Sequence, residues 1–234
     1  MKKILKIAHR GASAFEPENT LRAVERSMEL GADMIEVDVS AMSKDGHLIV
    51  IHDKTVDRTT NGRGYVFDMS LEELKGLDAG RGEKIPTLQE VIGAVRGRAK
   101  LLIDLKHPFS SVIERELVDV VQQERMNEDT VITSSEGTVL MRLKAINPKL
   151  KVALLVNGPV DDPEELALKF RADILHLGSP IWANMKVVRN AHSKRLSVFV
   201  GNPSSVKEIG QLIKLGVDGI TTDDPTLFPK ASKD

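Results

Sequence analysis

Cysteine is absent from the 234 residues of this sequence, which excludes disulfide bonds, thiolate metal ligands and a cysteine nucleophile. Long apolar stretches are absent too, since no run approaches the roughly 18 residues that a membrane-spanning helix needs. Neither sign of charge dominates, and a formal net charge of −1 gives no electrostatic argument for binding nucleic acid or an anionic membrane surface. The apolar run in Met1–Ala8 is too short for a secretory signal, and Lys6 interrupts it. We therefore expect a soluble, cytoplasmic protein that binds no nucleic acid and spans no membrane.

The length and organisation favour one domain. Barrels of the α/β class run to about 250 residues as a single domain, so a chain of 234 residues can form one. The sequence contains no linker, internal repeat or low-complexity tract that would separate a second domain. We expect a single domain over 1–234, and no interface stripe distinguishes a monomer from a homodimer.

Short apolar runs alternate with longer amphipathic stretches along almost the whole chain. The runs predict strands at Ile4–Ala8, Met34–Val39, Leu48–Ile51, Lys100–Leu105, Thr130–Thr133, Lys151–Val156, Ile174–Leu177, Leu196–Val200 and Asp218–Thr222. The amphipathic stretches predict helices at Asn19–Leu30, Thr87–Val95, Ser111–Glu124, Thr138–Ala145, Pro163–Phe170, Ile181–Ala191 and Val206–Leu215. Gly31 and Gly216 stand where a helix would end before the next strand. This alternation is typical of a parallel sheet with helical crossovers.

Counting Leu48–Ile51 as an extension of the second strand unit leaves eight strands, which predicts an α/β fold of the closed (β/α)8 TIM-barrel type. A doubly wound open sheet is the alternative, and it is disfavoured because no glycine-rich phosphate loop follows the first strand. Residues Asp53–Ile85 interrupt the alternation with Gly, Thr, Arg and Asp, and contain one short helical pattern, Leu71–Leu77. We predict that they form an insertion after the second strand unit that covers one face of the barrel.

Carboxylates interrupt two of the predicted strands. Glu36 and Asp38 stand two residues apart, so both side chains lie on the same face of their strand. Facing inward, two carboxylates would repel and lose hydration unless a cation such as Mg²⁺ or Ca²⁺ compensated them. Facing outward at a strand end, they would simply be solvated. Asp104 and Lys106 repeat the spacing on the next barrel strand, where they form either a salt bridge or part of a metal site.

Two histidines also follow strands. His9 ends the first strand and His52 ends the Leu48–Ile51 run, so both should lie at the same mouth of a barrel. Imidazole titrates near neutral pH and suits proton transfer, and the planar guanidinium of Arg10 matches phosphate oxygens. A lone histidine at a strand end is usually structural or exposed, and we interpret the remaining ones in that way: His47, His107, His176 and His192.

Two further polar motifs allow an ordinary structural interpretation. Asn19 or Thr20 is a good N-cap for the first helix, and the functional alternative is that Asn19 orients His9 or a substrate group. Asp223-Asp224-Pro225 follows the last strand, where Asp and Pro favour a turn.

The ordered motifs of the chain resemble those of the glycerophosphodiester phosphodiesterase family. They are His9-Arg10-Gly11, Pro17-Glu18-Asn19-Thr20, Gly31-Ala32-Asp33-Met34-Ile35-Glu36-Val37-Asp38-Val39, Asp45-Gly46, His52-Asp53, Arg58-Thr59-Thr60-Asn61-Gly62, Ile85-Pro86-Thr87-Leu88, Gly216-Val217-Asp218-Gly219-Ile220 and Thr222-Asp223-Asp224-Pro225. The resemblance spans nearly the whole chain and is most specific in its N-terminal part.

This resemblance implies a (β/α)8 barrel that hydrolyses glycerophosphodiesters to sn-glycerol 3-phosphate and an alcohol. It implies one divalent cation, Mg²⁺ or Ca²⁺ with Mn²⁺ as a further candidate. The implied roles are metal ligands for Glu36, Asp38 and Asp104, general acid and base for His9 and His52, and phosphate binding for Arg10 and Lys106. Asn19 and Asp53 are implied as supporting residues.

The sequence departs from the family pattern at three places. Asp104 replaces a Glu that is one methylene longer, so we expect it to reach the metal through a water molecule. Ser134-Ser135 replaces Ser-Phe, and Val200-Gly201-Asn202 replaces a run that begins Trp-Thr. Loss of two aromatic side chains from the mouth should widen or rehydrate the pocket. Three alternatives therefore stay open: a cyclising, phospholipase D-like barrel that acts on lysophospholipids, a non-catalytic binding barrel, and a metal-dependent aldolase or isomerase.

Overall fold

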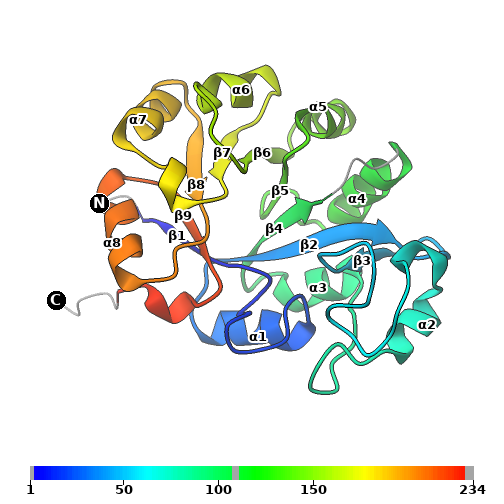
Figure 1. Cartoon of the computed structure of the whole chain (residues 1–234). Coiled ribbons are helices and arrows are strands. Elements are labelled where there is room, and N and C mark those ends of the chain that lie inside the picture. The colour runs from blue at the N-terminus through cyan, green and yellow to red at the C-terminus, as the bar shows by residue number, and fades with distance from the viewer. Residues whose placement is uncertain (1–2, 107–110, 230–234) are drawn as a thin grey trace.

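The computed structural model describes residues 3–106 and 111–229, and eight parallel strands form a closed barrel at its centre (Figure 1). These strands are β1 (Leu5–Ala8), β2 (Met34–Met42), β4 (Lys100–Leu105), β5 (Thr130–Ser134), β6 (Lys151–Val156), β7 (Ile174–Leu177), β8 (Ser197–Val200) and β9 (Gly219–Thr222). The barrel closes because β1 pairs in parallel with both β2 and β9. The predicted TIM barrel is confirmed, and the open-sheet alternative is wrong.

Helices surround the barrel and connect its strands (Figure 1). They are α1 (Leu21–Glu29), α3 (Leu88–Val95), α4 (Ser111–Gln123), α5 (Gly137–Ile146), α6 (Pro163–Lys169), α7 (Met185–Ser193) and α8 (Val206–Leu215). The left-handed conformation predicted for the C-terminal end of α8 is present, since Gly216 has φ +81°. The backbone N–H of Gly216 donates to carbonyl oxygens of the last turn of α8.

One predicted helix, Ile181–Ala191, is wrong as a continuous element. A short 3-10 helix, η2 (Pro180–Trp182), comes first, and α7 begins only at Met185. The side chain of Asn184 accepts a hydrogen bond from the backbone N–H of Val187 and so caps α7 at this point. Apolar periodicity alone does not predict a capping residue inside such a range.

The lower parts of the strands are apolar on both faces because helices cover the outside and side chains fill the inside. The inner cluster contains Ile7, Leu102, Ala153 and Phe199, all buried. A Cβ on Gly219 would lie 2.7 Å from the Phe199 ring, so the glycine makes room for that ring inside the barrel. The filled lower half leaves the C-terminal ends of the strands as the place for a site.

The insertion follows an extension of the second strand. β2 runs on to Met42 and pairs in an antiparallel manner with β3 (Leu48–Val50), as the eight-strand count required. The segment after β3 contains a 3-10 helix, η1 (Val66–Asp68), and the short helix α2 (Leu71–Gly76). Ser70 is the N-cap of α2 and forms a complete capping box there. This segment packs against the extension formed by β2 and β3 in a separate small core, which consists of Ala41, Ile49, Ile51, Val56, Val66, Leu74, Ala79 and Ile85. The predicted insertion is therefore confirmed, and it lies at one side of the barrel (Figure 1).

The described helices are short. The longest, α4, has 13 residues, whereas a membrane-spanning helix needs about 20. Within 3–106 and 111–229, none has the length and hydropathy that crossing a membrane requires.

Candidate active site

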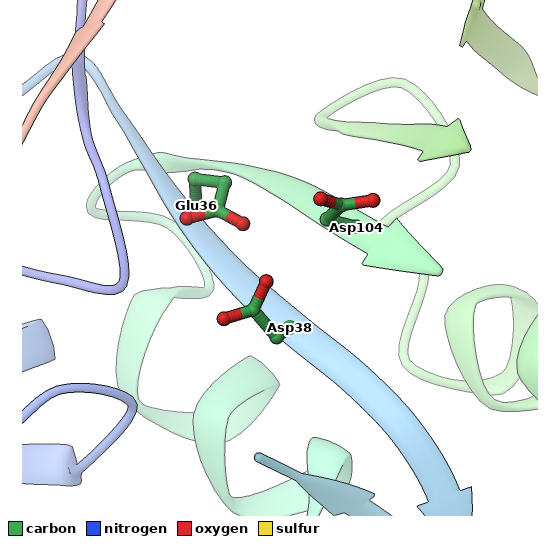
Figure 2. A group of neighbouring side chains, drawn as sticks. All are labelled: Glu36, Asp38 and Asp104. Atoms are coloured by element: carbon green, nitrogen blue, oxygen red, sulfur yellow. The ribbon is translucent and has the colours of Figure 1, made fainter. Parts of the chain in front are cut away.

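Three buried carboxylates meet at the C-terminal ends of two neighbouring strands (Figure 2). Glu36 and Asp38 come from β2 and Asp104 comes from β4, where Asp38 and Asp104 are register partners. Each offers an oxygen within 4.8 Å of the others, although the residues are only 2%, 0% and 5% exposed. The outward-facing, solvated alternative for the β2 pair is therefore wrong, and Asp104 joins the group that the sequence predicted.

The electrostatics of this acidic group fit a bound cation. Burial and the neighbouring Asp38 raise the pKa of Glu36 to about 8, and burial also raises the pKa of Asp104. Burial opposes ionisation of Asp38 as well, but Lys106 and Arg10 hold its pKa below the usual range. Three buried carboxylates in contact are costly unless positive charge compensates them. Their all-oxygen donor set is the type that Mg²⁺ and Ca²⁺ prefer.

The raised pKa of Glu36 predicts how stability depends on pH without metal. The folded protein holds a proton on Glu36 up to about pH 8, whereas an ordinary glutamate releases it near 4.5. Stability contributed by this group should therefore fall as pH rises from about 4.5 to 8. We expect the Tm of wild type in chelator to decrease across this range more steeply than that of Glu36→Gln. Equal slopes in calorimetry would contradict the assigned pKa.

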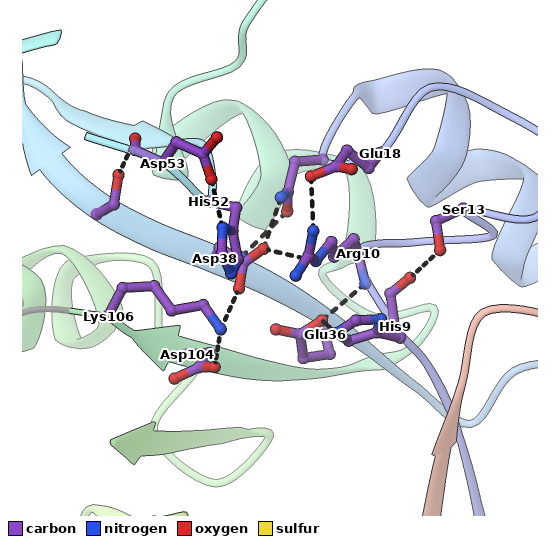
Figure 3. A network of polar contacts seen from close by, with 12 residues as sticks. His9, Arg10, Ser13, Glu18, Glu36, Asp38, His52, Asp53, Asp104 and Lys106 are labelled. Atoms are coloured by element: carbon purple, nitrogen blue, oxygen red, sulfur yellow. Dashed lines mark hydrogen bonds and ion pairs between the residues drawn. The ribbon is translucent and has the colours of Figure 1, made fainter. Parts of the chain in front are cut away.

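Two cationic side chains lie against the acidic group (Figure 3). Lys106 Nζ is 2.9 Å from Asp38 Oδ1 and also contacts Asp104. Arg10 Nε is 3.2 Å from Asp38 Oδ2, and its guanidinium donates to Glu18. Burial opposes the charged forms, but the surrounding carboxylates raise the pKa of both Lys106 and Arg10. Both side chains are therefore charged and face the place where an anion would approach the carboxylates.

His9 lies between an aspartate and the acidic group. Its Nδ1 is 2.6 Å from Asp223 Oδ1, and its Nε2 is 3.9 Å from Glu36 Oε2. Burial works against the imidazolium, but Glu36 and Asp223 together raise the pKa of His9. Because Asp223 binds Nδ1, the ring is oriented with Nε2 toward the acidic group.

The backbone after His9 is unusual and explains the glycine of the His-Arg-Gly motif. Arg10 and Gly11 both have positive φ, +53° and +79°. A Cβ at Gly11 would lie 2.7 Å from the backbone of Ala23 in α1, so only glycine fits. This conformation allows the backbone N–H of Arg10 to donate to Glu36 Oε2 at 2.7 Å. The turn thus fixes His9 and Glu36 relative to each other.

His52 has a similar carboxylate partner. Its Nδ1 is 2.5 Å from Asp53 Oδ1, and Arg58 Nε donates to Asp53 Oδ2 at 2.7 Å. The hydrogen bond from Arg58 lowers the pKa of Asp53 to about 2, so this aspartate is ionised. Arg58 also binds Glu18, which in turn binds Arg10. Ion pairs therefore run from His52 through Asp53, Arg58 and Glu18 to Arg10, the residue that follows His9.

A cavity of about 590 Å³ opens beside these residues. Its lining comes from the C-terminal ends of neighbouring strands and from the start of the insertion: His52, Asp53, Lys54, Asp104, Lys106, Ser135, Leu155 and Asn157. The volume lies within the range of small-molecule sites. Of the two positions where we expected a lost aromatic side chain to widen the mouth, Ser135 lines this cavity, whereas Val200 is buried in the main hydrophobic cluster. The inward position on that strand end belongs to Gly201.

Asn19 supports a residue of the acidic group. Thr20, not Asn19, caps α1 by accepting a hydrogen bond from Ala23 N. The Asn19 side chain instead donates to Asp38 Oδ2 at 2.7 Å and accepts from Asp38 N at 3.1 Å. It therefore orients a carboxylate of the acidic group, a partner that was not among the alternatives considered for Asn19.

Sequence interpretation missed Asp223, which it assigned to a turn. β9 pairs with β1 in register, with Thr222 beside Ala8, so the next residues on each strand are Asp223 and His9. Asn202 Nδ2 also lies 2.8 Å from His9 Nδ1. Pairing of the first and last strands of a predicted barrel is the signal that could have identified Asp223.

The four other histidines differ in where they lie. His47 belongs to the turn between β2 and β3, and His192 on α7 pairs with Asp218 at 2.8 Å. These two fit the predicted structural or surface role. His107 lies outside the described residues. His176 is buried inside the barrel on β7.

Known proteins are similar to this chain in both sequence and fold. The model of the glycerophosphoryl diester phosphodiesterase family matches residues 9–227. A glycerophosphodiester phosphodiesterase from Caldanaerobacter subterraneus subsp. tengcongensis is 41% identical and covers 95% of each chain. The crystal structure of a glycerophosphodiester phosphodiesterase from Agrobacterium tumefaciens has a TM-score of 0.86 and 30% identity, covering 97% of this chain and 99% of that one. A phosphodiesterase from Oleispira antarctica, in complex with the product sn-glycerol-3-phosphate, has a TM-score of 0.85 and 27% identity, covering 95% and 94%.

The matched range contains the acidic group and both histidine–aspartate pairs, from His9 to Asp223. The resemblance inferred from the motifs is confirmed by the family match, by 41% identity and by the shared barrel. The chain therefore belongs to the glycerophosphoryl diester phosphodiesterase family of enzymes.

Proposed function

We propose that this chain hydrolyses glycerophosphodiesters to sn-glycerol 3-phosphate and an alcohol, in a reaction that depends on one divalent cation. The observation that carries the proposal is the buried group of three carboxylates flanked by two histidine–aspartate pairs. A similar phosphodiesterase from Oleispira antarctica binds sn-glycerol-3-phosphate as its product, which supports the substrate class.

Glu36, Asp38 and Asp104 would hold the cation. Mg²⁺ and Ca²⁺ both accept carboxylate oxygens, and Mn²⁺ is a further candidate. When bound, the cation offsets negative charge that develops on the phosphoryl oxygens. Asn19 keeps Asp38 in place through two hydrogen bonds, and the Arg10 backbone does the same for Glu36. Hydrogen bonds therefore hold two of the three proposed ligands, Asp38 and Glu36, in place.

We assign phosphate binding to Arg10 and Lys106. Both are charged and lie beside the acidic group, so a phosphodiester that approaches this group meets two cations. The guanidinium of Arg10 is a planar fork that can bind two phosphate oxygens, whereas Lys106 contributes a single positive charge. Together they compensate the charge of the phosphate and orient it toward the histidines.

His9 and His52 act as the general acid and base. Each has Nδ1 bound to an aspartate, which leaves Nε2 available for proton transfer. One histidine removes a proton from the nucleophile, the P–O bond to the leaving alcohol breaks, and the other histidine protonates the departing oxygen. We favour the neighbouring glycerol hydroxyl as nucleophile, which gives a cyclic phosphate that water then opens. Direct attack by water is the alternative.

Hydrolysis of glycerophosphocholine followed by phosphorus NMR tests the proposal. With Mg²⁺, Ca²⁺ or Mn²⁺ present, we expect sn-glycerol 3-phosphate as the final product, and a transient cyclic phosphate if the glycerol hydroxyl attacks first. A cyclic phosphate as the sole product would favour the cyclising barrel. Folded protein that is inactive with all three cations would contradict the proposal and favour a binding barrel.

Asp223→Asn should lower kcat by about 10- to 100-fold, because Asp223 orients the imidazole of His9. This is part of the roughly 10²–10⁴-fold that a positioned acid or base contributes. Asp223 raises the pKa of His9, so the limb of the pH–rate profile that reports His9 should move to lower pH. The matched control is Asp224→Asn. Asp224 accepts hydrogen bonds from Thr226 at the start of a 3-10 helix, η3 (Pro225–Leu227), and has no contact with His9. Equal effects of both variants would contradict the assignment.

A further inference from the structure

Directly beneath the mouth, the barrel interior contains a layer of polar side chains. In a (β/α)8 barrel, alternate strands contribute the inward residues of one layer. The strand registers place Glu36 of β2, Thr133 of β5, His176 of β7 and Thr221 of β9 in the same layer. All four are buried. Only Glu36 has a role in the proposed reaction, so the other three require an explanation.

His176 uses only one of its two ring nitrogens. Nδ1 lies 3.3 Å from Thr133 Oγ1, and the ring packs edge-on against Phe199. Nε2 has no hydrogen bond to any residue in 3–106 or 111–229. Burial, and then the positive charges of His9 and Lys106, lower the pKa of His176 to about 3. The ring is therefore neutral at physiological pH, although it lies inside a strongly charged site.

The backbone above His176 carries no side chain. A Cβ at Gly201 would lie 3.8 Å from His176 Nε2 and 3.2 Å from Thr221 Cβ. Glycine therefore places no side chain against either residue at this point. The hydroxyl of Thr221 is buried and has no hydrogen-bond partner in the described part of the chain. Buried polar groups are nearly always hydrogen-bonded, so the unpaired hydroxyl of Thr221, close to an imidazole nitrogen that also lacks a hydrogen bond in the described residues, indicates a missing partner.

The missing partner should be a neutral group that both donates and accepts hydrogen bonds. If Thr133 donates to Nδ1, Nε2 of His176 carries a proton and donates; with the opposite tautomer, Nε2 accepts. A hydroxyl complements either tautomer, whereas a phosphate oxygen complements only a donor. The proposed phosphate-binding residues, Arg10 and Lys106, would already compensate the charged phosphate of the substrate. The layer below is apolar, with Ile7 and Phe199 buried, so the unpaired atoms can receive a ligand only from the mouth.

We infer that His176 is a substrate-binding residue on the floor of the site, where Nε2 hydrogen-bonds a hydroxyl of the glycerol moiety. Thr221 supplies a second hydroxyl contact. This assignment rests on the proposed glycerophosphodiester specificity and deepens it, since it assigns recognition of glycerol to residues separate from those that bind phosphate. It also gives Gly201 a role, because a side chain at this position would occupy the space above the floor.

His176→Leu tests the inference with two substrates. For glycerophosphocholine we expect kcat/KM to fall about tenfold through KM, the effect of losing one hydrogen bond of roughly 1.4 kcal/mol. Bis(p-nitrophenyl) phosphate lacks glycerol and can be cleaved only by direct attack of water, so its kcat/KM, however low, should stay within about twofold. His176→Asn, which keeps a polar side chain, should recover part of the loss. Equal losses with both substrates would show a structural role and overturn the inference, as would no loss with either.

A measurement on wild type avoids any folding defect of the variants. The ¹⁵N shift of His176 Nε2 is followed in the Mg²⁺-loaded protein during titration with sn-glycerol 3-phosphate or with inorganic phosphate. We expect a change with the first and a much smaller one with the second. The same response to both, or to neither, would overturn the inference. If wild type binds sn-glycerol 3-phosphate through His176 but hydrolyses no diester, the proposed function fails while the glycerol site stands.

Discussion

Replacing His52 with alanine should lower kcat for a glycerophosphodiester by about 10²–10⁴-fold, the contribution of a positioned general acid or base. Metal affinity should stay within about twofold, because His52 does not belong to the acidic group. The imidazole is held by Asp53 through Nδ1, and Arg58 fixes that aspartate in turn, so proton transfer at Nε2 is the function that the substitution removes.

Steady-state kinetics and a calorimetric metal titration separate the two effects. His47→Ala is a matched control, since His47 lies on the turn between β2 and β3 and contributes its backbone to that turn. We expect this control to keep kcat within about twofold. Loss of metal binding in His52→Ala, or an unchanged kcat, would contradict the assigned role.

Glu36→Gln should lower affinity for the divalent cation by at least about 100-fold and abolish metal-dependent hydrolysis. The expectation follows from the loss of an anionic ligand, because affinity in oxygen sites depends strongly on the number of charged ligands. Glutamine keeps the size of the side chain and can still accept the hydrogen bond from the Arg10 backbone. The turn that carries His9 should therefore remain folded, and the loss reports the charge alone.

Calorimetry with Mg²⁺ and Ca²⁺ measures this effect, and Glu25→Gln serves as its control. Glu25 lies on the exposed side of α1 and pairs with Arg98, so its charge can be removed without touching the acidic group. We expect the control to bind metal like wild type. Normal metal affinity in Glu36→Gln would show that the cation binds elsewhere.

Periodicity predicted which faces carry the three carboxylates, and the family resemblance selected the metal-binding alternative. Carboxylates two residues apart on a parallel strand must share a face, and the next strand in a barrel brings its own residues alongside in register. Glu36, Asp38 and Asp104 meet for this reason, and the shorter side chain of Asp104 does not remove it from the group. The barrel itself follows from the same alternation of strands and helices.

Features that depend on barrel closure were not predictable from local pattern. Asp223 reaches His9 only because β9 lies beside β1, across 214 positions of sequence. The partner of Asn19 was left open from sequence, and in the structure a residue that looks like a helix cap has a positive φ of +59° and binds Asp38. His176 resembles an ordinary core histidine in sequence, and only the unpaired Nε2 and the bare backbone at Gly201 distinguish it.

Anomalous diffraction from crystals soaked with Mn²⁺ and sn-glycerol 3-phosphate tests the central claim most directly. The account predicts one strong anomalous peak bounded by Glu36, Asp38 and Asp104, with phosphate density on the side of Arg10 and Lys106. No peak at this position, or a peak only at another position, would contradict the proposal that these three carboxylates hold the catalytic cation.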